Sequence, residues 1–224
     1  MHLILPRSHH DNSSETDYIV LIQTGRIVRG SWIKMKIVLA STSPRRLELL
    51  RGLGLNVKVV GSRVKESKFS IKNPEKLVKT LALTKAQEVA SRTKDGLVIG
   101  ADTIVVLRGK ILGKPKDSKE SKSMLRELSG RTHEVLTGLA VIDASSGKTM
   151  VDFVRTKVKF RKLTDEEIAN YVAADKPFDK AGAYAIQEKA GLFVEKINGC
   201  YFNVVGLPLA RLAEILKEFN VTLV

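Results

Sequence analysis

The most apolar stretch of the chain reads LVIGADTIVVL and covers residues 97–107. Its length and its β-branched residues favour a buried strand. Gly109 lies in the turn that follows, and Ile111-Leu112 returns along the strand, so the segment predicts a central β-hairpin. Asp102-Thr103 interrupts the apolar run. A lone carboxylate there is costly, so Asp102 is either satisfied by backbone donors or acts as a metal ligand or general base.

Strand and helix patterns alternate on both sides of this hairpin. Strand patterns cover residues 37–40, 57–60, 132–143 and 150–160, and strands are expected around Asn198-Gly199. Helices are expected to begin at Pro44 behind the N-cap hydroxyls of Ser41-Thr42-Ser43, at Asn73-Pro74, at Asp117-Ser118, at Thr164 with its capping-box partner Glu167, and after Pro208. This mixture predicts an α/β fold with a mixed sheet and flanking helices.

Composition limits the class of protein. A chain of 224 residues with 43% apolar content suits one folding unit, and its formal charge of +14 attracts polyanions without choosing among nucleic acid, membrane and phosphorylated metabolites. The single cysteine, Cys200, follows a turn signal and favours a structural role. No stretch approaches the ~20 apolar residues of a transmembrane helix, so we expect a soluble, cytoplasmic protein. Residues 1–34 lack the patterning of 35–224 and are expected to be a poorly ordered extension.

A lysine interrupts the apolar face of the helix that begins at Pro74. At about 100° per residue, Lys85 lies at the centre of a face formed by Leu77, Val78, Leu81 and Val89. Either its stem packs while the ammonium reaches water, or the ammonium meets an anion. Replacing it by methionine removes a charge from an apolar face, so the sequence predicts a variant at least as stable that binds an anionic ligand more weakly.

The hexapeptide STSPRR, residues 41–46, lies at a strand-to-helix junction. Free backbone N–H groups and the positive end of the helix combine there with hydroxyls and two guanidinium groups, which favours a phosphate site. A capped helix with two solvated arginines is the alternative.

Other kinds of site fit the sequence poorly. The chain has no glycine-rich phosphate loop followed by lysine and serine, and one cysteine with four scattered histidines offers no zinc set. His133 lies in a strand pattern and is expected to be structural. Hard oxygen ligands remain, which points to Mg²⁺ or Mn²⁺ as the divalent cofactor.

Six motifs occur in order between Met35 and about Leu216, and together they resemble the Maf family of nucleotide pyrophosphatases. They are LASTSPRR (39–46), LTKA (83–86), GADT (100–103), LGKP (112–115), LSGRTH (128–133) and DKAGAY (179–184). The resemblance implies an elongated mixed α/β fold, related to that of inosine triphosphate pyrophosphatases, with a site between two lobes around a cleft. It also implies a homodimer.

The resemblance further implies roles for single residues. Asp102 corresponds to the proton acceptor, and Glu66 resembles the metal-binding carboxylate, with Asp102 expected as a second ligand. Lys85 and Lys114 join Asp102 as catalytic residues that contact phosphates. The implied substrate-binding residues are Ser41, Ser43, Arg45, Arg46, Thr103 and Gln187.

Branches of the family with different substrates differ in the segment that follows Lys-Ala-Gly. The segment AYAIQ, residues 183–187, looks like the branch that hydrolyses dTTP and UTP, and Arg45, Thr103 and Gln187 match its residues for substrate choice. Ala185 and Glu188 stand where the family usually has glycine, and a positive φ at Ala185 would force the loop to shift. The sequence therefore predicts a pyrimidine triphosphate pyrophosphatase. The alternatives are a 7-methyl-GTP or purine pyrophosphatase and a non-enzymatic, nucleic-acid-binding regulator of division, and nucleic acid is the less expected partner because it explains neither Asp102 nor Lys85.

Overall fold

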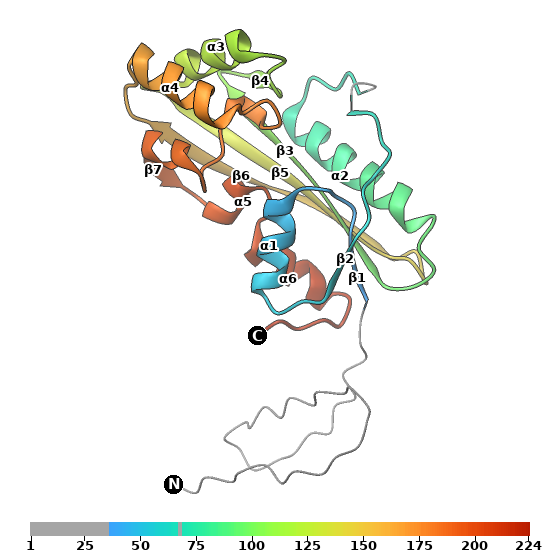
Figure 1. Cartoon of the computed structure of the whole chain (residues 1–224). Helices are drawn as coiled ribbons and strands as arrows, with labels where there is room; N and C mark the ends of the chain where they lie inside the picture. Colours follow the sequence, from blue (N-terminus) through green and yellow to red (C-terminus); the bar gives the residue numbers. More distant parts are fainter. Residues whose placement is uncertain (1–35, 67–68) are drawn as a thin grey trace, which may run out of the picture. The chain divides into compact units, whose positions relative to one another are not determined.

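The computed structural model describes residues 36–66 and 69–224, which contain a seven-stranded mixed sheet (Figure 1). The strand order is β2-β1-β3-β5-β6-β7, with β4 paired to β3; β1 runs parallel to β2 and β3, and the remaining pairs are antiparallel. The strands are β1 (Ile37–Leu39), β2 (Val57–Val59), β3 (Leu97–Leu107), β4 (Lys110–Leu112), β5 (Thr132–Asp143), β6 (Thr149–Phe160) and β7 (Val194–Asn198). The predicted mixed α/β sheet and its central hairpin are confirmed.

Helices pack on both faces of the sheet (Figure 1). On one face α2 (Pro74–Ala90) forms a core with even-numbered strand residues such as Val98. On the other face α1 (Pro44–Gly52) and α6 (Leu209–Lys217) pack on odd-numbered residues such as Ile99, because successive side chains of a strand alternate between faces. A further core around Phe160 lies under α3 (Ser118–Leu128) and α4 (Asp165–Asp175).

Two glycines bring α2 close to the sheet. A Cβ atom on Gly100 would lie 2.3 Å from the carbonyl oxygen of Ala82, and one on Gly138 would lie 2.1 Å from that of Val78. Gly138 is the β5 residue opposite Asp102 in the register of the two strands. Because neither glycine has a side chain, the backbone of α2 lies directly on the strands beside Asp102.

The middle of β3 has an open edge. β1 pairs with residues 97–99, and β4 pairs with residues 105–107 on the same side of the strand. Within the described parts of the chain, no strand pairs with residues 100–104 on that side. Side chains from both faces of β3 can therefore reach the gap.

Several local predictions hold and some do not. Asn73, Asp117 and Thr164 cap their helices, and Thr164 forms the predicted capping box with Glu167. Ser43 is the N-cap of α1, but the expected side-chain cap is wrong because its hydroxyl makes no such bond.

The expectation of strands around Asn198-Gly199 is confirmed before the turn and wrong after it. β7 ends at Asn198, and the chain then forms the short helix α5 (Tyr201–Val205). Gly199 has a φ of 123°, and the amide of Cys200 donates to Thr156 Oγ1, so the chain turns away from the strand direction there.

The positive φ considered for Ala185 occurs elsewhere in its loop. Gly182 and Ala183, in the 3₁₀ turn η2 (Ala181–Ala183), have φ values of 67° and 61°. A second 3₁₀ segment, η3 (Lys189–Phe193), leads into β7. Ala185 therefore imposes no left-handed strain on the loop that precedes Gln187.

Two further expectations concern the N-terminal residues and membrane-spanning helices. The prediction that residues 1–34 form a poorly ordered extension lies outside the described residues. In the parts of the chain that the structure describes, no helix has the length and apolar content to cross a membrane.

Candidate active site

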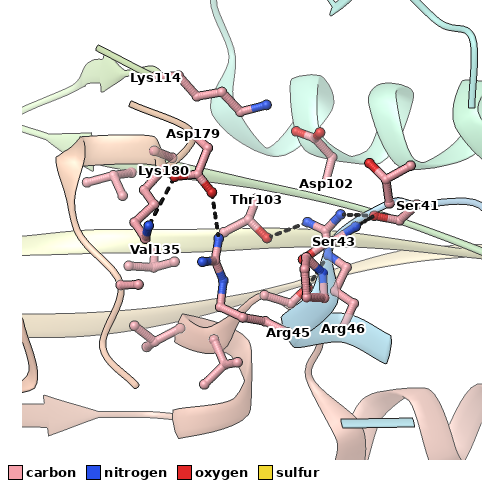
Figure 2. Close-up of a pocket in the computed structure, with 18 of the residues that line it drawn as sticks. Ser41, Ser43, Arg45, Arg46, Asp102, Thr103, Lys114, Val135, Asp179 and Lys180 are labelled. Carbon is pink, nitrogen blue, oxygen red and sulfur yellow. Dashed lines mark hydrogen bonds and ion pairs between the residues drawn. The ribbon is translucent and has the colours of Figure 1, made fainter. Parts of the chain in front are cut away.

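A pocket of about 330 Å³ lies at the open edge of β3 (Figure 2). Side chains reach it from α1, α2, β3, the loops after β2 and β4, and the segment before β7. The structure brings together every residue that the sequence selected for the site: Ser41, Ser43, Arg45, Arg46, Glu66, Lys85, Asp102, Thr103, Lys114 and Gln187 all line this pocket. Their individual roles remain predictions.

Lys85 links two carboxylates on the α2 side of β3. Its Nζ donates to Asp102 Oδ1 at 2.5 Å and to Glu66 Oε1 at 2.6 Å. Only 11% of the Lys85 side chain is exposed, so the ammonium does not reach out to water. We call Lys85, Asp102 and Glu66 the carboxylate cluster. Two carboxylates around one ammonium give this cluster a net charge of −1 when all three groups are ionised.

Burial and charge act in opposite directions on the two carboxyl groups. Burial raises the pKa of Asp102, and the attraction of Lys85 and Arg46 only partly offsets it. Burial also raises the pKa of Glu66, but the hydrogen bond and charge of Lys85 together with the charges of Lys114 and Arg46 outweigh it, so that pKa lies below its ordinary value. Asp102 is therefore the carboxyl group that takes up a proton more readily.

Arg46 binds uncharged partners on the other side of β3. Its Nε donates to the carbonyl of Gly206 at 2.8 Å, and its Nη1 donates to the carbonyl of Ala101 at 2.9 Å and to Ser41 Oγ at 3.1 Å. Its Nη2 donates to Thr103 Oγ1 at 3.0 Å. Four of the five guanidinium N–H groups are thus occupied, which leaves one for a phosphate.

A chain of hydroxyl groups continues from Arg46 into the core. Thr137 Oγ1 donates to the carbonyl of buried Asn203 at 3.0 Å, so it accepts from Thr103 Oγ1, which lies 2.9 Å away. Because each hydroxyl has one proton, the donor direction is fixed from Arg46 to Asn203. We call Arg46, Thr103, Thr137 and Asn203 the arginine anchor. It ties α1 and β3 to the segment that ends at Gly206.

The N-terminus of α1 faces the pocket with free donors. Pro44 has no N–H, and Ser43 N donates to Ser41 Oγ. Among the described residues, no group accepts from the backbone N–H groups of Arg45 and Arg46. Lys114 adds a positive charge; its side chain is 57% exposed and its Nζ lies 3.9 Å from Glu66 Oε2. This part of the pocket suits a phosphate group.

Four alternating charges form a second group, and three of them, Arg45, Asp179 and Lys180, line the pocket. Arg45 lies 3.4 Å from Glu188 and 4.0 Å from Asp179, while Lys180 lies 3.0 Å from Asp179 and 3.4 Å from Glu188. We call these four residues the charge ring, and its formal charges cancel. Burial raises the pKa of Asp179, but the hydrogen bond and charge of Lys180, a backbone hydrogen bond and the charge of Arg45 together outweigh it, so Asp179 stays ionised at neutral pH.

His133 lies outside this pocket and has the structural role expected of it. Its Nε2 is 2.8 Å from the hydroxyl of Tyr184, and its ring packs edge-on against Phe160. Burial lowers the pKa of His133 to about 4, so the ring is neutral at physiological pH.

Residues 36–219 match the family described as Maf-like protein. The chain belongs to the Maf family. Among its relatives, a protein of Alkaliphilus metalliredigens named dTTP/UTP pyrophosphatase is 50% identical over 190 residues, which cover 84% of this chain and 98% of the relative. A protein of the same name from Carboxydothermus hydrogenoformans is 51% identical over 186 residues, covering 83% and 100%. The structure is also similar to the Ham1 protein of Staphylococcus aureus, with a TM-score of 0.40 and 14% identity over 56% of this chain and 71% of that one.

The donor set of this Maf domain fits a magnesium-type ion. Glu66 and Asp102 are held at one ammonium, and each has a second oxygen that Lys85 does not occupy. In the described residues no group of three or more His, Cys, Asp or Glu side chains could hold a metal. Mg²⁺ is commonly bound by one or two carboxylates together with substrate phosphates, so two carboxylates are sufficient.

Sequence reasoning gave no role to several residues of this Maf domain that shape the site. Asp179 and Lys180 were part of a motif, and Glu188 was noted only as a departure from the family. Thr137 and Asn203 were not singled out, although each is a polar residue in a mainly apolar segment, the same pattern that drew attention to Asp102.

Proposed function

We propose that this protein hydrolyses dTTP and UTP to the nucleoside monophosphate and pyrophosphate. The observation that carries the proposal is the buried Asp102 carboxylate, which opens into the same pocket as the N-terminus of α1. A proton acceptor beside a phosphate-binding helix end is the arrangement that hydrolysis of a phosphoanhydride requires. The names of the relatives supply the substrates.

The chain's own groups would hold the triphosphate. The N–H groups at the start of α1, the remaining N–H of Arg46 and the exposed ammonium of Lys114 all face the pocket and suit phosphate oxygens. Lys85 contributes positive charge from the α2 side of the pocket, although its ammonium is already bonded to two carboxylates. The serines of residues 41–43 add hydroxyl donors at the same end.

We propose Glu66 and Asp102 as ligands of a divalent cation, Mg²⁺ or Mn²⁺. When bound, such an ion neutralises phosphate charge and lowers the pKa of a water molecule. Asp102, whose pKa burial raises, would assist removal of the proton from the attacking water. The water oxygen bonds to the α-phosphorus, the bond from that phosphorus to the α,β-bridging oxygen breaks, and pyrophosphate leaves with the electron pair.

Base recognition is proposed for Gln187. It lines the pocket, and its amide has both a donor and an acceptor for the O4 and N3–H edge of uracil or thymine. Thr103, the other residue matched to substrate choice, already accepts from Arg46 and donates to Thr137. It therefore acts by fixing the wall of the pocket.

We also propose that the protein is cytoplasmic and forms a homodimer. Light scattering on the purified full chain would test the dimer.

A nucleotide panel with product analysis tests the proposal. The full chain is incubated with dTTP, UTP, CTP, ATP, GTP and 7-methyl-GTP, with Mg²⁺ or Mn²⁺ and with chelator, and the products are separated by chromatography. We expect monophosphate and intact pyrophosphate, highest kcat/KM for dTTP and UTP, and activity that disappears with chelator and returns with metal. Orthophosphate as the first product would defeat the mechanism, a preference for guanine nucleotides would support the 7-methyl-GTP alternative, and no hydrolysis at all would favour a regulator.

A further inference from the structure

The charge ring contributes a carboxylate to the pocket at a distance from the carboxylate cluster. Figure 2 shows Asp179 with Lys180 and Arg45 on one side of the view and Asp102 on the other. Asp179, Arg45 and Lys180 line the pocket, whereas Glu188 does not belong to its lining. The Asp179 side chain is 68% exposed, against 25% for Arg45 and 9% for Lys180. Asp179 is therefore the member of the ring most open to a ligand.

We propose that Asp179 is a specificity-determining residue that accepts the N3–H of uracil or thymine and so separates UTP from CTP. The inference rests on the proposed function and revises its base recognition: Gln187 donates to O4, and Asp179, rather than the Gln187 carbonyl, accepts from N3–H. Uracil and thymine present acceptor, donor and acceptor along their pairing edge, while cytosine has an unprotonated N3 and an amino group at position 4.

Gln187 alone cannot make this distinction. Its side-chain amide can rotate by half a turn, which exchanges its donor and its acceptor. In one orientation it matches O4 and N3–H of uracil, and in the other it matches N3 and the amino group of cytosine. A site that reads the base through Gln187 only would accept both pyrimidines.

Asp179 cannot reverse in this way. An ionised carboxylate only accepts hydrogen bonds, and the bond from Lys180 at 3.0 Å together with the Arg45 guanidinium at 4.0 Å keeps it ionised. Each of its oxygens has a further lone pair for a ligand. Gln187, Asp179 and the Arg45 guanidinium all line the pocket and together offer donor, acceptor and donor, which complements the uracil edge and places an anion against the lone pair of cytosine N3.

The neighbouring wall of the pocket suits a base. Val105 of β3 and Val135 of β5 are paired in register, and both line the pocket. Val105 lies three residues beyond Asp102, which is about 10 Å along a strand. The reacting phosphate and the base would thus occupy different stretches of β3, with the sugar between them.

The test is the ratio of kcat/KM for UTP to kcat/KM for CTP in the full chain and in Asp179→Asn. An asparagine at this position offers an amide that can donate to cytosine N3, so we expect the ratio to fall about tenfold to a hundredfold. The ratio does not depend on the fraction of enzyme that is folded, because both substrates are measured on the same preparation.

Glu188→Gln is the matched control. It removes one negative charge from the same ring, at a residue outside the pocket lining, so we expect both substrates to change together and the ratio to stay within about threefold of that of the unmodified protein. An unchanged ratio in Asp179→Asn, or an equal fall in Glu188→Gln, would overturn the inference. A failure of the proposed function looks different, since the unmodified protein would then release no pyrophosphate from UTP.

Discussion

The carboxylate cluster and the arginine anchor are both polar groups embedded beside β3, but they differ in how completely their members are satisfied. Lys85 has two negatively charged partners, and each carboxylate keeps one oxygen to which Lys85 does not donate. Arg46 has two carbonyl and two hydroxyl partners that occupy four of its five donors. Chemistry requires groups that can still bind or move a proton, so we assign chemistry to the first cluster and positioning to the second.

The largest effect is expected at Asp102, because this residue is the proposed proton acceptor of the carboxylate cluster. Asp102→Asn keeps the size of the side chain but removes its capacity to accept a proton, so turnover of dTTP should fall by roughly 10²–10⁴. Steady-state kinetics and a thermal unfolding curve, measured together, separate lost chemistry from lost folding. Near-normal turnover in the folded variant would move the base to another residue.

Lys85→Met tests the charge balance of the same cluster. The sequence alone predicts that this variant is at least as stable as the unmodified protein. The ion pairs argue against that prediction, because the substitution leaves the buried Asp102 carboxylate without its nearest counter-ion. We expect the free energy of unfolding to fall by roughly 3 kcal/mol, as measured by chemical denaturation. The double variant Lys85→Met with Asp102→Asn removes both buried charges and should recover most of that loss. No recovery would show that the lysine stem, rather than its charge, supplies the stability.

These two residues also show how far sequence alone can lead. Lys85 and Asp102 were detectable because each is a charge in an apolar pattern, and the mixed sheet followed from alternating strand and helix patterns. Their partnership was not detectable, because it depends on α2 lying directly on Gly100 and Gly138. A contact between residues of opposite charge depends on how closely two elements approach, and periodicity within one element does not report that distance.

The charge ring was beyond sequence reasoning for a different reason. Arg45 and Glu188 are separated by 143 residues and meet only because the segment before β7 returns to the start of α1. The helix after Gly199 was missed for a related reason: the turn signal was correct, but the tertiary contact with Thr156 decides the direction in which the chain leaves it. Long-range contacts of this kind leave no local pattern.

His133 is a third buried polar group, and unlike Lys85 and Arg46 it has a single neutral hydrogen-bond partner, Tyr184. Burial lowers the pKa of His133 to about 4 in the folded protein, against an ordinary value of about 6.5. The unfolded chain therefore binds more protons between these values, and stability should fall as the pH drops from about 6.5 to about 4. The full linkage amounts to about 3 kcal/mol. Denaturation of the unmodified protein and of His133→Gln at several pH values measures it, since glutamine does not titrate, and parallel curves would contradict it.

The smallest expected effect concerns Arg46, and it decides whether the arginine anchor acts through its charge or its shape. Arg46→Lys keeps the positive charge but loses the planar arrangement of five donors, so it cannot reach Gly206, Ala101 and Thr103 together. If charge is what matters, stability and KM should barely change. If the geometry matters, we expect a loss of about 2 kcal/mol in the free energy of unfolding, because buried acceptors lose their donors.

Arg45→Lys is the control for this last prediction, because Arg45 is the adjacent residue of the same helix and its partners lie 3.4 Å and 4.0 Å away. Such partly exposed ion pairs contribute about 0–1 kcal/mol, so this variant should unfold nearly like the unmodified protein. A clear difference between the two lysine variants would establish that neighbouring arginines of one motif divide their tasks, with Arg46 fixing the pocket wall and Arg45 facing the ligand. Equal losses would show instead that any change at the start of α1 disturbs the helix, and the distinction between the two clusters would fail at that point.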